Sequence, residues 1–321
     1  MDTGHLRVGA RVTRVAAVDC GTNSVRLLVT DIDPVTNTQI DLDRRLEIVR
    51  LGQDVDRTGR LAPEALARTM RALRSYAEVI DDLGAQRVRM VATSATRDAA
   101  NRAEFVAGVR AVLGVEPEVV TGDEEAALSF AGATRLLPAT IPAPYLVADI
   151  GGGSTELAVG AGDLLAARSV DVGSVRLTER RFHSDPPSSA DVAAAIDDID
   201  AAIDVAEHDV PVSSAGSLIG LAGSVTSVAA IHLDLPAYDS TVIHHSRICA
   251  DDIRVVSDRL LAASHDERAA IPSLHPGRVD IIAAGALILR RLVERAGVDE
   301  VLVSENDILD GIAWSQVEPV V

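Results

Sequence analysis

Residues 147–160, VADIGGGSTELAVG, combine glycines, hydroxyl groups and carboxylates at a spacing that suits phosphate chemistry. A run of glycines lets a ligand approach the backbone closely, and successive N–H groups in such a turn form a binding site for anions. Asp149 and Glu156 flank the turn. Carboxylates beside a phosphate would repel it unless a hard cation lay between them, which predicts Mg²⁺ held by these two residues. The expected phosphate ligands of the turn are Gly151, Gly152, Gly153 and Ser154.

Two plainer interpretations of this segment remain open. The glycines can form an ordinary turn between strands, and Asp149 can cap that turn by accepting hydrogen bonds from nearby N–H groups. A dinucleotide-binding turn is disfavoured, because it would need a helix after the glycines, whereas TELAV alternates and continues as a strand.

A second copy of the pattern favours a functional interpretation. VDCGTNSVRLLV, residues 18–29, aligns without a gap with ADIGGGSTELAV, residues 148–159, so that Asp19 matches Asp149. Asn23 and Ser24 are the expected phosphate contacts of this first turn, although an Asn-Ser pair also forms ordinary turns. A repeat this far apart in the chain predicts two related domains, each opening with a strand, a turn and a second strand.

The composition of the 321 residues is that of a globular chain, with 47% hydrophobic, 24% charged and only 2% aromatic residues. This length fits about two domains, and their cores must be aliphatic. The net charge of −18 argues against nucleic acid as a partner. It does not exclude an anionic substrate, because distant charges are screened and local groups decide binding. All 30 basic residues are arginine, which excludes a Walker A loop and Schiff-base lysine chemistry.

The sequence favours neither a membrane protein nor a secreted one. The longest apolar segment, residues 281–289, is too short to span a bilayer, and the first residues lack the apolar region of a secretory signal. The two cysteines, Cys20 and Cys249, make neither a disulfide framework nor a cysteine zinc site. We therefore expect a cytoplasmic protein in a reducing compartment.

Alternating strand and helix patterns predict an α/β fold with a partly parallel sheet. In the first half the expected elements are strands at 15–19, 25–33, 87–93 and 116–120, a helix from Pro63 to Gly84, and, after a loop at 94–97, a helix ending near Leu113. In the second half they are strands at 145–150 and 301–305 and helices after the loop 183–191, at 278–296 and at 307–316. The proline-rich segment 135–145 marks the boundary between domains 1–135 and 136–321. The last helix is expected to be able to pack back on the first domain.

Polar residues elsewhere complete the candidate site. Thr121 to Glu124 fits a capping box, which gives Glu124 a structural role and leaves Glu125 without one, although first-turn glutamates commonly face solvent. Arg97, in the expected loop after a strand, can clamp a phosphate through two N–H groups. Arg278 begins an expected helix, where a positive charge is unfavourable and a functional reason is therefore favoured. Residues that suit secondary phosphate contacts, or merely tight loops, are Ser174, Gly223 and Ser224.

In order and in kind, these motifs resemble the exopolyphosphatase and guanosine pentaphosphate phosphatase family of the actin–hexokinase–sugar kinase superfamily. DIGGGSTE at 149–156 is similar to the family's phosphate-binding signature, and VDCGTNSVRLLV to its first phosphate loop. VATSATRDAANRAEF at 91–105 and VVTGDEEAALSFAGA at 119–133 resemble two further family motifs. The resemblance covers about residues 14 to 316 and implies two actin-like (ribonuclease H-like) domains around an interdomain cleft.

The resemblance further implies hydrolysis of a phosphoanhydride. Glu125 would accept a proton from the water that attacks the terminal phosphorus, with Arg97 and Mg²⁺ also in the site. The expected function is an exopolyphosphatase acting on inorganic polyphosphate as a homodimer, and hydrolysis of guanosine pentaphosphate is the near alternative. A small-molecule kinase and a non-catalytic alarmone or nucleotide sensor are alternatives of another class. Because longer family members continue for roughly another domain beyond the position of Val321, we expect a preference for shorter chains.

Overall fold

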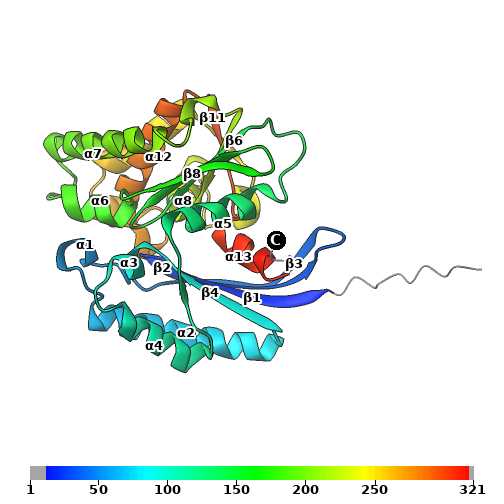
Figure 1. The fold of residues 1–321 in the computed structure, drawn as a ribbon. Helices are drawn as coiled ribbons and strands as arrows, with labels where there is room; N and C mark the ends of the chain where they lie inside the picture. The colour runs from blue at the N-terminus through cyan, green and yellow to red at the C-terminus, as the bar shows by residue number, and fades with distance from the viewer. Residues whose placement is uncertain (1–11, 318–321) are drawn as a thin grey trace, which may run out of the picture.

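The computed structural model describes residues 12–317, which form two lobes, each built on one mixed β-sheet (Figure 1). The strands of the first sheet lie in the order β3 (Thr38–Ile48), β2 (Ser24–Asp33), β1 (Thr13–Cys20), β4 (Arg87–Ala92) and β5 (Glu118–Val119). The strands of the second sheet lie in the order β8 (Leu164–Val170), β7 (Thr155–Gly160), β6 (Tyr145–Ile150), β9 (Ser217–Leu221), β11 (Glu300–Val303) and β10 (Arg247–Cys249).

The two sheets repeat one topology. Strands β1, β2 and β3 form an antiparallel meander, and so do β6, β7 and β8. The next strands, β4 and β9, pair parallel with β1 and β6, and helical crossovers make these parallel pairs possible. The predicted α/β class, with two related actin-like (ribonuclease H-like) lobes, is thereby confirmed.

Helices connect the strands in both lobes. Those of the first lobe are α1 (Val55–Thr58), α2 (Pro63–Leu83), α3 (Ser94–Asp98) and α4 (Arg102–Leu113). The remaining helices are α5 (Gly122–Thr134), α6 (Ser174–Arg181), α7 (Ser189–Glu207), α8 (Ala222–His232), α9 (Ser240–Ile243), α10 (Ala250–Ala262), α11 (His265–Ala269), α12 (Ile282–Ala296) and α13 (Ile308–Ser315). Short 3₁₀ turns span Val212–Ser214 and Pro276–Arg278. Between residues 12 and 317, no helix is both long and apolar enough to cross a membrane.

Two helices, α5 and α13, lie side by side between the two sheets (Figure 1). Helices α2 and α4 cover the outer face of the first sheet, while α13 packs on its inner face through Ile312 and Trp314. Helix α5 packs on the second sheet through Phe130. Glycine permits this close approach, because a Cβ on Gly132 would lie 1.8 Å from the carbonyl oxygen of Asp307. The last helix therefore packs on the first lobe, and α5 on the second.

Several elements differ from their sequence-based prediction. Residues 94–97 belong to helix α3 rather than to a loop, because the carbonyl of Thr93 already accepts hydrogen bonds from the N–H groups of Thr96 and Arg97. Arg278 ends a 3₁₀ turn, and α12 begins only at Ile282. The strand expected at 116–120 shortens to the two residues of β5. Strands β3, β8, β9 and β10 were not predicted. The boundary at residue 135 falls after α5, whose apolar face packs on the second sheet.

Candidate active site

A cavity of about 650 Å³, counted to its open mouth, lies where the two strand turns face each other. Its wall contains residues of both lobes, because the β1–β2 turn closes it on one side and the β6–β7 turn on the other. The sequence-predicted site residues that line it are Asn23, Ser24, Glu125, Asp149, Gly151, Gly152, Ser154, Ser174, Gly223, Ser224 and Arg278. Three predicted site residues, Arg97, Gly153 and Glu156, lie outside this wall.

The two turns close in the same way. The N–H of Gly21 donates to the carbonyl of Ser24 at 2.9 Å, and the N–H of Gly151 donates to that of Ser154 at 3.0 Å. In the second turn, no acceptor within residues 12–317 takes up the backbone N–H groups of Gly152 and Gly153. Gly153 itself faces the first lobe, since a Cβ there would lie 2.6 Å from the hydroxyl of Thr22. Free N–H groups in such a turn are suited to binding an anion.

The third part of the cavity wall is the start of α8, where Gly223 and Ser224 lie in the first helical turn. First-turn N–H groups have no partner within their helix and favour negative charge. Ala222, just before them, has a left-handed φ of 63°, a conformation that L-residues adopt at a cost. Strained backbone conformations of this kind are found most often at functional sites.

Arg278 places its guanidinium over this helix start. A Cβ on Gly223 would lie 1.1 Å from Nη1 of Arg278, so that only glycine fits beneath it. Burial lowers the pKa of Arg278, and in the described part of the chain no carboxylate forms an ion pair with it. A half-buried arginine without an ion pair, facing a cavity, is expected to bind a negatively charged ligand.

Three buried carboxylates lie at or behind the other side of the cavity. Asp149 and Glu156 are directly opposite each other in the β6–β7 ladder, which puts both side chains on one face of the sheet. Burial raises the pKa of Asp149 to about 6 and that of Glu156 to about 8, and charge repulsion from neighbouring acids adds to both shifts. Burial, followed by the charge of Glu156, also raises the pKa of Glu125 well above its usual range. Such a cluster favours either a proton or a cation.

Arg97 contacts the base candidate rather than the cavity. Its Nη1 donates to Oε2 of Glu125 and to the carbonyl of Val120, both at 3.1 Å. The expected phosphate clamp is therefore replaced by an ion pair that orients Glu125. Glu125 is only 8% exposed, whereas its neighbour Glu124 lies on the surface and makes half of the expected capping box, its N–H donating to Thr121 Oγ1.

The donor set fits a hard divalent cation. Oδ1 of Asp19 is buried without a hydrogen-bond partner, and Asp149 lies in the same cavity wall. Over residues 12–317, no three acidic, histidine or cysteine side chains are arranged to hold a metal by themselves. This combination suits a divalent cation that is bound through one or two carboxylates together with water and substrate phosphate oxygens.

The Ppx/GppA phosphatase family matches residues 28–318 of the chain. The protein belongs to this family. A relative from Mycobacterium tuberculosis (strain H37Rv) named exopolyphosphatase 2 is 48% identical over 95% of this chain and 98% of its own length. The crystal structure of an exopolyphosphatase-like protein superposes with a TM-score of 0.92 at 40% identity, covering 95% of this chain and 97% of that one. The Aquifex aeolicus Ppx/GppA enzyme superposes with a TM-score of 0.80 at 29% identity, covering 95% of this chain and all of that one.

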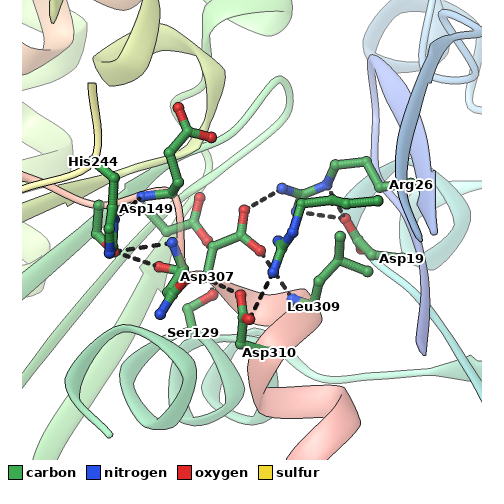
Figure 2. A network of polar contacts seen from close by, with 12 residues as sticks. Asp19, Arg26, Ser129, Asp149, His244, Asp307, Leu309 and Asp310 are labelled. Carbon is green, nitrogen blue, oxygen red and sulfur yellow. Dashed lines mark hydrogen bonds and ion pairs between the residues drawn. The ribbon is translucent and has the colours of Figure 1, made fainter. Parts of the chain in front are cut away.

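The wall of the cavity between the two turns also contains residues that were not predicted from the sequence. Arg26 donates from Nη2 to Asp19 at 2.7 Å and forms an ion pair with Asp307, the N-cap of α13 (Figure 2). The alignment of the two copies could have pointed to Arg26. Asp19 matches Asp149 in both copies, and Arg26, which lies opposite Asp19 in the ladder, occupies the position of Glu156. The other wall residues missed are Gly21, Thr22, Thr93, Ser94, Ile150, Ala222, Ile281 and Ile308.

Glu156→Gln is expected to stabilise the metal-free Ppx/GppA chain. The pKa of Glu156 rises from 4.5 to about 8 on folding, so this carboxyl favours the folded state less and less as the pH rises through that window. Removing the charge should raise the free energy of unfolding at pH 8 by about 1–3 kcal/mol and leave it nearly unchanged at pH 4.

Urea unfolding in the presence of a chelator measures this difference. Glu64→Gln, in the exposed first turn of α2, is the matched control and should change stability little at either pH. A Glu156→Gln protein less stable than the wild type at pH 8 would show that the ionised carboxylate is compensated within the fold.

Proposed function

We propose that the chain is an exopolyphosphatase, which releases the terminal phosphate of inorganic polyphosphate by attack of water. One observation carries the proposal: a buried glutamate, Glu125, and a half-buried arginine without an ion pair, Arg278, share a cavity with two opposed anion-binding turns. A row of anion sites suits a chain of phosphates. The 48% identity to a protein named exopolyphosphatase 2 supports the same substrate.

In this proposal the backbone N–H groups of the two turns bind phosphate oxygens. Asn23 and Ser24 act from the first lobe, and Gly151, Gly152 and Ser154 act from the second, with Gly153 shaping the turn against the first lobe. Ser174, Gly223 and Ser224 make secondary contacts, and Arg278 neutralises charge that spreads over the transferred phosphoryl group. The protein contributes mainly positions and electrostatic stabilisation, as phosphoryl transfer requires.

Glu125 is proposed as the general base. Its raised pKa makes it a stronger proton acceptor than an exposed glutamate, and Arg97 fixes its orientation. The proton of the attacking water moves to a carboxylate oxygen of Glu125, while the oxygen of that water bonds to the terminal phosphorus. The bond from that phosphorus to the bridging oxygen breaks, and the electron pair stays with the shortened chain.

We further propose that Asp149 would hold Mg²⁺, with Glu156, opposite it in the ladder, as the second acid of the metal site. A bound divalent cation would neutralise developing negative charge on the phosphate oxygens. Removing divalent cations with a chelator is expected to lower phosphate release by at least about 10²-fold, and adding Mg²⁺ back should restore it. Full activity in the chelated protein would contradict a metal requirement.

The deciding experiment compares phosphate release from four substrates, each with and without Mg²⁺: short polyphosphate, long polyphosphate, guanosine pentaphosphate and ATP. The proposal predicts release from polyphosphate in the absence of any acceptor alcohol, which a kinase would not give. Relatives from Vibrio campbellii and Vibrio vulnificus, each 28% identical, are named guanosine-5'-triphosphate,3'-diphosphate pyrophosphatase. Release from guanosine pentaphosphate alone would transfer the proposal to that substrate, and no release from any of the four would favour a sensor.

We also propose a cytoplasmic setting for the protein. Cys20 is buried and Cys249 exposed, and both are free thiols, as a reducing cytoplasm would keep them. A homodimer is proposed from the family resemblance, and light scattering at high protein concentration tests it. Inorganic polyphosphate, rather than nucleic acid, is the proposed partner of this acidic chain.

A further inference from the structure

Arg176, on α6, contacts three elements at once outside the cavity wall. Its Nε donates to the carbonyl of Gly153 at 2.7 Å, its Nη1 to Asp56 of α1 at 2.9 Å, and its Nη2 to Asp98 of α3 at 2.5 Å. Its side chain is only 12% exposed. One guanidinium therefore joins the glycine turn of the second lobe to two helices of the first.

The backbone of α6 fixes the other two carbonyls of the same turn. The N–H of Ser174 donates to the carbonyl of Gly151 at 2.9 Å, and the N–H of Val175 donates to that of Gly152 at 2.8 Å. In a trans peptide the C=O of one residue and the N–H of the next point in opposite directions. Each carbonyl held toward α6 thus turns the following N–H, of Gly152 or of Gly153, away from α6.

Arg176 supplies the third and last of these contacts. By holding the carbonyl of Gly153, it orients the next N–H, that of Ser154, a cavity residue. Only this contact depends on the other lobe, since the fork of Arg176 is itself held by Asp56 and Asp98. The first two contacts lie within the second lobe.

Helix α3 links the same contact to the base. Asp98 holds Arg176, and its neighbour Arg97 holds Glu125. At the other end of α3, the hydroxyl of Ser94 lies 2.8 Å from that of Thr22 in the first turn. Both turns and the glutamate are therefore attached to one short segment of the first lobe.

We propose that Arg176 is a positioning residue, which orients the Gly153–Ser154 peptide for phosphate when Asp56 and Asp98 of the first lobe hold its guanidinium. The inference rests on the proposed function, because it assigns the turn to phosphate binding. Arg176 does not touch the substrate. It makes the geometry of the second turn depend on the approach of the first lobe.

Arg176→Ala is expected to lower kcat for release from tripolyphosphate by about 10–10²-fold, less than the loss of a direct donor, because the peptide can still sample the correct orientation. KM should rise at the same time. Arg176→Lys retains the charge but lacks the planar fork, so an intermediate rate is expected. Asp98→Asn should shift kcat in the same direction as Arg176→Ala.

Arg180→Ala is the matched control. Arg180 lies one helical turn further along α6 and donates to the same Asp56 at 2.5 and 2.7 Å, but it does not contact the glycine turn. Its side chain is 38% exposed, and losing such a surface pair should change kcat/KM by less than about fivefold. Both Arg180→Ala and Arg176→Ala remove an ion pair with Asp56 across the two lobes. Only Arg176→Ala also removes the hydrogen bond to the carbonyl of Gly153 in the glycine turn.

The outcomes separate the inference from the proposed function. A wild-type protein inactive on every phosphoanhydride would refute the function, whatever the variants do. If the wild type is active, equal kcat in Arg176→Ala and Arg180→Ala would overturn the inference. Should Arg176→Ala lose its cooperative unfolding transition, Arg176→Lys and Asp98→Asn decide instead, and wild-type kcat and KM in both would overturn the inference.

Discussion

Glu125→Gln is expected to lower kcat for phosphate release from polyphosphate by about 10²–10⁴-fold, the contribution of a general base. Glutamine is isosteric with glutamate but does not accept a proton at neutral pH. Its amide oxygen can still accept the hydrogen bond from Arg97, so the local structure should persist. Steady-state kinetics with short polyphosphate and Mg²⁺ measure the change, and KM is expected to stay within a small factor of the wild-type value.

The same variant should fold at least as stably as the wild type. Burial raises the pKa of Glu125, so ionising it costs stability at neutral pH, and the amide avoids that cost. Glu124→Gln is the matched control, since Glu124 is adjacent in sequence but has a side chain 47% exposed. A Glu125→Gln protein with the rate of the Glu124→Gln protein would show that another group accepts the proton.

Arg278→Ala is expected to lower kcat/KM for the same substrate by about 10²–10³-fold, the usual loss for one positioned donor in a water-excluded site. The guanidinium lies over Gly223, and among the described residues it is the one arginine of the cavity wall that forms no ion pair with a carboxylate. Arg26, the other arginine in that wall, is already paired with Asp19 and Asp307. Arg278 is thus the arginine most available to a phosphate.

Arg278→Lys should recover only part of the loss, because lysine offers a point charge without the planar fork. The matched control is Arg45→Ala, since Arg45 lies in the adjacent cavity but is 43% exposed and paired with Asp43. If Arg45→Ala lost as much activity as Arg278→Ala, the effect would come from the overall positive potential and not from a placed contact.

The repeat allowed the site's framework to be predicted from the sequence. Two gapless copies of one strand–turn–strand pattern predicted two lobes of like topology, and the turn of each copy predicted phosphate contacts. These features are local, because a turn depends on residues that are adjacent in the chain. The ends of α2 were predictable for the same reason, since Pro63 and Gly84 act on their own segment.

Features that depend on packing between distant segments could not be predicted from the sequence. Arg97 reads as a phosphate clamp in sequence, and only the placement of α5 beside α3 turns it toward Glu125. The edge strand β3 was missed although its stretch IDLDRRLE alternates apolar and charged residues with one break, at Arg44, which is the signal of a strand. Its apolar residues stay largely exposed in the structure, because β3 lies at the edge of the sheet. The packing of α5 on the second lobe and of α13 on the first likewise depends on contacts between distant segments.

Two site residues, Asp19 and Arg26, could have been predicted from the repeat but were not. Asp19 was aligned with Asp149 but not assigned to the site, although its buried Oδ1 is left without a hydrogen-bond partner. Arg26 replaces Glu156 in the alignment, so the first hairpin carries an ion pair where the second carries two acids. A comparison of the two copies position by position would have indicated an arginine in one lobe where the other has a second acid.

Hydrolysis of tripolyphosphate in water enriched in heavy oxygen tests the central claim most directly. If Glu125 activates water against the terminal phosphorus, the orthophosphate released early should carry one heavy oxygen and the pyrophosphate none. Glu125→Gln should release almost no labelled product. Label in the pyrophosphate, or unlabelled orthophosphate, would contradict attack of water on the terminal phosphorus in this cavity.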